Sequence, residues 1–265
     1  MTRVEEALAD TANAAGAVGG VYVYGVTWAD AAREQPAAGV GEANVGIVRC
    51  DDLAALTTTV ENPRVRARRR DLIAHSEVLR AALERGTVLP LSFGTVLESA
   101  EAVVRHFLEP RRDELRRLLR ELESRVELSV RAFYREDAIL AEIVRENPRI
   151  ARLREAVRTG PEAATYGLRI ELGELVAAEL RARSRRDADA ILERVRPLSL
   201  AVDEDREPIE HQVLRASFLV ERDRVEAFDE AMNDLAGRYD GLIHFKYLGP
   251  LPPHSFVSLT PTERP

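Results

Sequence analysis

The chain has 265 residues, a net charge of −7 and a hydrophobic fraction of 45%, which is enough for two domains that each bury a core. Its single cysteine, Cys50, excludes an internal disulfide and a cysteine-based zinc site, and the acidic balance argues against broad nucleic-acid binding. The apolar stretches are too short to cross a bilayer and the N-terminus lacks the features of a secretory signal, so we expect a cytoplasmic protein outside the membrane.

The first half of the chain is predicted to begin with a flexible arm, residues 1–20, and then to form a small sheet. The β-branched and aromatic run over residues 21–26 predicts a strand, and the apolar runs at 45–48 and 53–60 could form two more, although residues 53–56 could equally begin a helix. From residue 64 to 85 the pattern becomes helical. The face that we expect this helix to bury comprises Val65, Leu72, Ile73, Val78, Leu79 and Leu83.

Two prolines are expected to interrupt the elements that follow. Residues 87–96 predict a strand with an irregularity at Pro90, because proline cannot donate to a sheet ladder. A helix is predicted from residue 99 to 125, and Pro110 should kink or break it. We place the domain boundary near residue 125.

The second half predicts the element order β-α-β-β-α-β, with a long helical insert. Residues 126–134 alternate between apolar and polar side chains, which indicates a strand with one buried and one solvent-exposed face. The solvent-exposed face carries Glu127, Ser129 and Arg131. Three helices are predicted next: one over residues 136–146, a second that ends near residue 158, and a long third one that ends at residue 196. A hairpin over 198–202 and 212–220, a helix over 225–239 and a strand over 242–248 complete the predicted elements.

This order is that of the ferredoxin-like fold, in which helices cover one face of an antiparallel sheet. We therefore predict an α+β protein of two domains, residues 21–124 and 125–265, both variants of the ferredoxin-like fold. The first is a modified version, and the second carries the helical insert and a proline-rich tail.

The sequence shows little that points to catalysis. None of the histidines has metal-ligand spacing, no nucleotide-binding or hydrolase motif is present, and the acidic residues 203–207 fit no calcium loop. The basic run at residues 63–70 could contact phosphate or an acidic protein, but we favour the simpler interpretation that it is the solvated start of a helix. We expect no catalytic, cofactor or metal site.

Three unusual stretches occur in order along the chain. They are Tyr22-Val23-Tyr24-Gly25, Leu89-Pro90-Leu91-Ser92-Phe93-Gly94-Thr95 and Gly249-Pro250-Leu251-Pro252-Pro253-His254-Ser255-Phe256. With these stretches the sequence, from about residue 21 to 259, resembles the gas vesicle F/L proteins, which are accessory proteins needed to build the gas-filled shells of buoyant microbes. That family often has aromatic residues where this chain has Leu251 and His254.

The resemblance implies two domains related to the ferredoxin-like fold, no enzymatic activity, and a role in gas vesicle assembly. It implies contact with the small hydrophobic shell protein and with other accessory proteins, and hence association with gas vesicles in the cytoplasm. The candidate contact or family-motif residues are Tyr24, Gly25, Pro90, Phe93, Gly94, Gly249, Pro250, Pro252, Pro253 and Phe256.

Three surfaces are candidates for the contact: an open sheet edge near Leu91 and Phe93, the helical insert at residues 167–196, and the C-terminal tail. We prefer the insert or the tail, although the tail would equally well pack across its own domain.

Two other function classes remain open at this point. Paired ferredoxin-like domains also occur in haem-binding enzymes resembling chlorite dismutase, for which His75, His211 or His244 would be the candidate ligand. The third hypothesis is a regulatory module that senses a small ligand.

Overall fold

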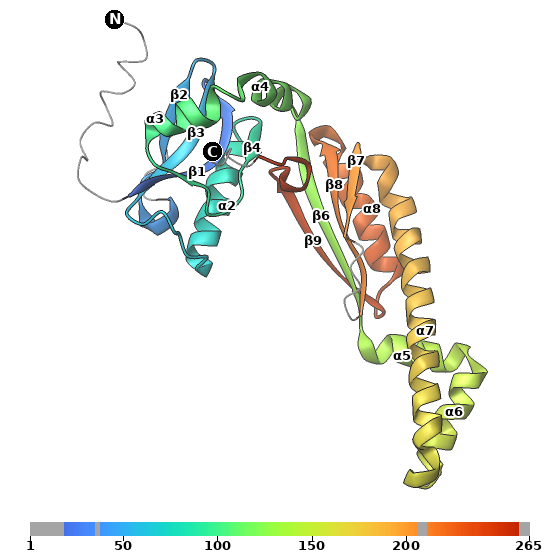
Figure 1. Cartoon of the computed structure of the whole chain (residues 1–265). Helices are drawn as coiled ribbons and strands as arrows, with labels where there is room; N and C mark the ends of the chain where they lie inside the picture. Colours follow the sequence, from blue (N-terminus) through green and yellow to red (C-terminus); the bar gives the residue numbers. More distant parts are fainter. Residues whose placement is uncertain (1–18, 35–37, 206–210, 260–265) are drawn as a thin grey trace, which may run out of the picture. The chain divides into compact units, whose positions relative to one another are not determined.

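The computed structural model describes residues 19–34, 38–205 and 211–259, which group into two compact units (Figure 1). The first unit comprises Met1–Glu127 and Pro250–Pro265, and the second comprises Leu128–Gly249. Their contacts thus group the C-terminal tail with the first unit, whereas the sequence analysis assigned it to the second domain. Most of the proposed N-terminal arm, up to residue 18, lies outside the described residues.

The first unit is built on an antiparallel sheet in the order β2-β3-β1-β4, with the short strand β5 also paired to β1. Seen from the other edge, this is the ferredoxin-like order, in which the first strand is central. Between β1 and β2 the described residues form only one 3-10 turn, so this unit is the modified version that the sequence predicted. Its elements are β1 (Gly20–Trp28), β2 (Gly46–Cys50), β3 (Leu53–Val60), α2 (Arg69–Leu83), β4 (Val88–Pro90), β5 (Val96–Leu97), α3 (Ala100–Val103) and α4 (Arg112–Glu121).

Helix α2 begins later than predicted and buries a different face. Its buried residues are Asp71, His75, Val78, Leu79, Ala82 and Leu83, which repeat at intervals of three and four. The prediction was wrong for Leu72 and Ile73, which are 42% and 52% exposed. Two polar residues take the core positions instead, because each finds a partner there: an Asp71 carboxylate oxygen accepts the Gly41 N–H at 3.1 Å, and His75 bonds to Tyr22.

The interruptions predicted at the two prolines are confirmed. Strand β4 ends at Pro90 and the pairing with β1 resumes only at Val96, after a five-residue detour. The long predicted helix is divided by Pro110 into α3 with a π-helical turn, Val104–Leu108, and α4.

Glycine is required where β1 faces β4. A Cβ atom on Gly25 would lie 2.6 Å from the carbonyl oxygen of Leu89 and 2.9 Å from the Leu79 side chain of α2. Backbone and helix therefore approach β1 more closely here than any side chain would allow.

The second unit has a four-stranded antiparallel sheet in the order β7-β8-β6-β9, which is again the ferredoxin-like order. Helices α7 and α8 lie on one face of this sheet, and α5 and α6 pack along α7 (Figure 1). The elements are β6 (Arg125–Tyr134), α5 (Glu136–Glu146), α6 (Pro148–Thr159), α7 (Glu162–Val195), β7 (Ala201–Glu204), β8 (Gln212–Glu221), α8 (Val225–Arg238) and β9 (Ile243–Leu251). The α+β class, the two sheets and the long helical insert are thus confirmed.

The core of this unit joins the inner face of the sheet to the helices. Leu128 and Val130 of β6 and Phe218 of β8 pack against Ile191 of α7 and Phe228 of α8, all of them inaccessible to solvent. In the part of the chain that the structure describes, no helix combines the length and apolar character needed to span a membrane.

Candidate functional site

The three sequence motifs supply residues to one cluster in the first unit, centred on His75 of α2. The His75 ring lies 5.8 Å from Tyr22, 5.6 Å from Tyr24, 5.7 Å from Phe93 and 6.4 Å from His254, measured between ring centroids. We call these five residues the motif cluster. Residues more than 230 positions apart in the sequence therefore meet around one buried imidazole.

Hydrogen bonds join Tyr22 of this cluster to both Gly94 and His75. The Gly94 N–H donates to the Tyr22 hydroxyl at 3.2 Å, and that hydroxyl lies 2.8 Å from Nδ1 of His75. A hydroxyl oxygen can accept two hydrogen bonds, so the direction of the bond to Nδ1 depends on the tautomer of the His75 ring. Gly94 reaches this position with a φ of +90°, which glycine adopts without strain.

The electrostatics agree with neutral groups. Burial and, to a smaller extent, the nearby His254 lower the pKa of His75 to about 4, against the opposing effect of a hydrogen bond with the Leu91 backbone. Burial also raises the pKa of the Tyr22 hydroxyl, against the effect of the Gly94 N–H. Near neutral pH the cluster is uncharged, and its contacts are those of packing and hydrogen bonding.

The remaining residues of the first two motifs also serve the interior. The Tyr24 hydroxyl donates to Oγ1 of Thr58 at 2.9 Å and accepts the Val40 N–H at 2.7 Å. Gly25 lies opposite Pro90 in the pairing of β1 with β4. The first motif is thus joined directly to the second by the sheet ladder.

The C-terminal motif is fastened to the first unit by Glu127. The backbone N–H and the hydroxyl of Ser255 each donate to the Glu127 carboxylate at 2.8 Å. The prediction of a wet position was therefore wrong for Glu127, which is only 4% exposed. Pro252 and Pro253 are buried.

The other members of this motif are more accessible to solvent. Phe256 is half-buried, whereas Gly249 and Pro250 are exposed. Gly249 has a φ of +157° and is the last residue of the second unit. Contact of any motif residue with a partner stays a prediction.

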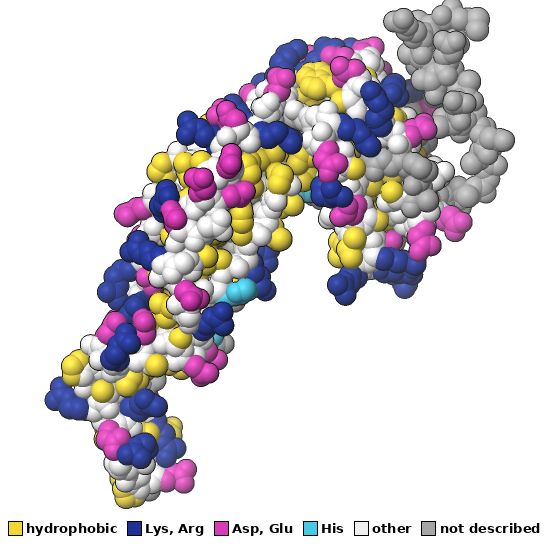
Figure 2. Space-filling view, turned by 180° about the vertical axis from the view of Figure 1, so that it is seen from behind, with side chains coloured by type: hydrophobic (Ala, Val, Ile, Leu, Met, Phe, Trp, Pro, Cys, Tyr) yellow, Lys and Arg dark blue, Asp and Glu magenta, His cyan; other side chains and the backbone are white. Residues whose placement is uncertain are grey.

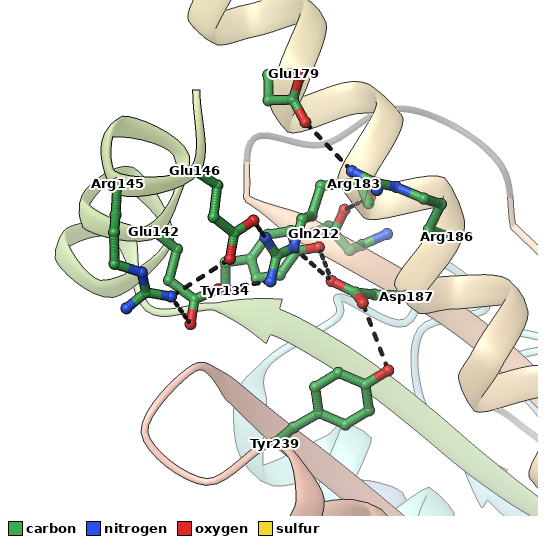
Figure 3. A network of polar contacts seen from close by, with 11 residues as sticks. Tyr134, Glu142, Arg145, Glu146, Glu179, Arg183, Arg186, Asp187, Gln212 and Tyr239 are labelled. Carbon is green, nitrogen blue, oxygen red and sulfur yellow. Dashed lines mark hydrogen bonds and ion pairs between the residues drawn. The ribbon is translucent and has the colours of Figure 1, made fainter. Parts of the chain in front are cut away.

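A second arrangement of polar side chains lies in the second unit, between α5, α7 and the sheet (Figure 3). Arg183 of α7 donates to Glu146 at 2.5 Å and to Glu142 at 2.6 Å, both on α5. The Tyr134 hydroxyl, at the end of β6, donates to Asp187 of α7 at 2.5 Å. We call this set, Tyr134, Glu142, Glu146, Arg183 and Asp187, the α7 lock.

The α7 lock ties the helical insert to the body of the unit. Tyr239 reaches the other oxygen of Asp187 at 3.5 Å, and Nε of Arg183 lies 3.7 Å from Asp187. The side chains of Arg183 and Asp187 are 18% and 16% exposed, so their interactions are partly shielded from water. A guanidinium that contacts three carboxylates suits positioning of a helix.

Two exposed apolar surfaces stand out among the described residues. On α7, Tyr166 and Ile170 are 71% and 49% exposed, one turn apart. On α2, Leu72 and Ile73 are exposed in the same way. The sequence analysis missed the surface on α2 because it assigned Leu72 and Ile73 to the core. It also missed the central position of His75, because the residues around His75 do not have the spacing of metal ligands.

The three histidines weighed as haem ligands are divided between the two units. His75 is held in the first unit by Tyr22, whereas His211 and His244 belong to the second unit, and His244 is exposed on β9. Among the described residues, no three His, Cys, Asp or Glu side chains are placed to hold a metal ion. Of the acidic loop, Glu204 and Asp205 form ion pairs with Arg196 and Arg215, and residue 207 lies outside the described residues.

Comparison with known proteins gives one consistent result. The model of the family described as gas vesicle synthesis protein GvpL/GvpF matches residues 20–258. Gas vesicle protein F of a Streptomyces strain is 35% identical over 239 residues, which cover 89% of this chain and 98% of that protein. Gas vesicle protein L1 of Halobacterium salinarum is 24% identical, with 83% of each chain covered. The crystal structure of GvpF from Anabaena superposes with a TM-score of 0.75 at 24% identity, covering 91% of this chain and 99% of that one.

Proposed function

Because the chain belongs to the GvpL/GvpF family of gas vesicle synthesis proteins, we propose that it acts in gas vesicle assembly by binding the small hydrophobic shell protein. A shell must present an apolar face to gas, so its free subunits expose apolar surface that drives aggregation. A partner that covers this surface and releases it on assembly meets that need without catalysing a reaction. Other accessory proteins are further partners under the same proposal.

The observation that carries this proposal is an unoccupied apolar stripe on α7. Tyr166 and Ile170 are followed at helical spacing by Gly173 and Ala177, and a Cβ atom on Gly173 would meet no atom within 4 Å. Large apolar residues followed by small ones form a shallow surface on which an amphipathic helix can lie. We call these four residues the α7 stripe.

The α7 stripe is presented by a helix that is held from its other sides. Leu172, Leu175 and Val176 of the same helix pack against the core of the second unit. Arg149 of α6 pairs with Glu171 at 2.6 Å, and the α7 lock fastens the helix further along. A helix fixed in this way loses little additional entropy when a partner binds to it.

The contacts weaken the alternative of strand addition near Leu91 and Phe93. Leu91 is 1% exposed, and its N–H already donates to the Tyr24 carbonyl at 2.8 Å. Phe93 belongs to the motif cluster. Substitution of either residue would damage the fold before it damaged an interface, so the α7 stripe is the better candidate.

The test is co-expression of the tagged chain with the shell protein of the same gas vesicle gene set, followed by affinity capture and size-exclusion chromatography. We expect a complex that contains both proteins, and we expect Ile170→Glu to reduce its yield about tenfold, because a carboxylate would be placed in an apolar contact. Leu200→Glu is the matched control, since Leu200 is 50% exposed and lies outside the stripe. Equal yields from the two variants would rule out the stripe, and capture of the chain without any shell protein would rule out the proposed partner.

A further inference from the structure

The exposed apolar residues of α2 line a pocket at the start of that helix. The pocket has a volume of about 460 Å³ and is lined by Ala67, Arg69, Leu72, Ile73, Ser76 and Glu77. Ala67 precedes the N-cap residue Arg68, and the other lining residues belong to α2. Figure 2 shows hydrophobic side chains beside a group of Lys and Arg at this end of the first unit.

Several exposed arginines lie close together in the sequence beside this pocket. Arg64, Arg66, Arg68 and Arg69 are exposed, and within the described parts of the chain none of them forms an ion pair. By contrast, at least fourteen arginines elsewhere are paired with carboxylates, for example Arg116 with Asp52 at 2.7 Å. Six consecutive positions of an acidic chain thus carry four arginines that have no carboxylate partner among the described residues.

Local structure does not account for this concentration of charge. Cations at the beginning of a helix are unfavourable with the helix dipole, so these arginines contribute nothing to α2. Glu77, which lines the pocket, is already paired with Arg80 at 2.5 Å. The two exposed apolar side chains also lose free energy by facing water.

We propose that this surface, Arg64–Arg69 with Leu72 and Ile73, binds an acidic amphipathic helix of a partner protein. Apolar side chains of that helix would enter the pocket against Leu72 and Ile73, and its carboxylates would pair with the four arginines. The net charge of −7 and the apolar pair favour a protein partner over a nucleic acid, which would use the arginines and leave Leu72 and Ile73 in water. The partner differs in chemistry from the one proposed for the α7 stripe, so the chain would join two components of the assembly.

The test measures binding of the full-length chain to a set of fluorescent synthetic peptides by anisotropy. The first peptide is a 20-residue amphipathic helix with leucines on one face and glutamates on the other. The second replaces glutamate with lysine, and the third keeps the glutamates but replaces leucine with serine. A 20-nucleotide single-stranded DNA serves as the fourth probe. We expect the first peptide to bind at least about tenfold more tightly than each of the others, because it alone offers both carboxylates and apolar side chains.

Variants then locate the interaction. Arg66→Glu with Arg69→Glu should weaken binding of the first peptide about tenfold and flatten its salt dependence, and Ile73→Ser should weaken it about fivefold. Arg49→Glu is the matched control, because Arg49 is also exposed and has no ion pair within the described residues. Equal binding of DNA and the first peptide would overturn the proposal, as would an unaltered affinity of Ile73→Ser.

The outcome is separable from that of the proposed function. Ile170→Glu lies in the other unit and should leave peptide binding unchanged, whereas the α2 variants should still capture the shell protein. Loss of both activities in either set of variants would indicate one shared surface and would contradict the second partner.

Discussion

The two units share a strand order, and in each a tyrosine of the central strand bonds to a helix, but the chemistry of the bond differs. In the first unit Tyr22 of β1 meets a neutral His75 of α2. In the second unit Tyr134 of β6 meets a carboxylate, Asp187 of α7, which also contacts Arg183 and Tyr239. One fold thus fixes its helix with an uncharged buried cluster in one copy and with a charged, partly exposed network in the other.

This difference indicates which unit tolerates change. Tyr22, Tyr24 and His75 of the motif cluster have few alternative partners, because all three are buried. The α7 lock is redundant, since Asp187 has three neighbours that donate to it or pair with it. We therefore expect substitutions in the first unit to be costly and those in the lock to be mild and local.

The largest effect is expected where the backbones approach most closely. Gly25→Ala would place a methyl group 2.6 Å from the Leu89 carbonyl oxygen, and the ladder between β1 and β4 cannot yield without moving α2. We expect the first unit to lose about 3 kcal/mol of stability. Gly46→Ala in β2 is the matched control, because its nearest neighbour would be Thr57 Oγ1 at 4.0 Å.

Urea unfolding followed by hydrogen exchange of β1 peptides measures this loss in the first unit separately, because the two units need not unfold together. Equal stability of the two glycine variants would mean that β1 and β4 can separate without cost, contrary to the packing described above.

Acid should weaken the motif cluster through His75. The pKa of His75 is lowered from 6.5 to about 4 on folding, so the unfolded chain binds more protons between these values. The contribution is fully present above pH 6.5 and is lost as the pH falls towards 4, and it amounts to about 3 kcal/mol. The titratable groups facing His75 are Tyr22, Tyr24 and His254, with Asp71 close to the two tyrosines.

The variant His75→Gln keeps a hydrogen-bonding side chain but removes this titration. When the pH falls from 6.5 to 4, the first unit of the variant should therefore lose less stability than the first unit of the original protein. Unfolding in urea at each pH measures this loss for both proteins. Parallel stability curves for the two proteins would show that His75 is protonated in the folded state without penalty.

Much of the fold could be predicted from the sequence because its signals are local. Each of three features predicts an element without knowledge of its neighbours. They are the prolines at positions 90 and 110, the alternation of apolar and polar residues along β6, and the long stretch of helical periodicity that forms α7. The face of α2 could not be predicted in this way. Asp71 and His75 occupy buried positions because of hydrogen bonds to residues 30 and 53 positions away, while Leu72 and Ile73 are left outside.

The candidate site shows the same division. The motif residues were recognisable as unusual, but their meeting around His75 depends on the tail returning to the first unit through Glu127 and Ser255. Ser255 belongs to the third motif, but nothing in the sequence marks Glu127 as its partner. A surface that binds a partner is defined by what the fold leaves exposed, so Tyr166 and Ile170 could be identified only once the packing of α7 was known.

The paired substitutions Tyr22→Phe and Tyr134→Phe test the comparison most directly, since each removes one hydroxyl and little volume. In the first unit the Gly94 N–H and Nδ1 of His75 both lose their partner inside the protein, and we expect a loss of about 2 kcal/mol. In the second unit Asp187 keeps Arg183 and Tyr239, and we expect a loss of about 1 kcal/mol or less. Hydrogen exchange should show faster opening across β1 in Tyr22→Phe, but only around the end of β6 and α5 in Tyr134→Phe. If Tyr134→Phe opened the whole second unit, the α7 lock would be as indispensable as the motif cluster. The proposed distinction between a buried cluster without alternative partners and a network with several partners would then be wrong.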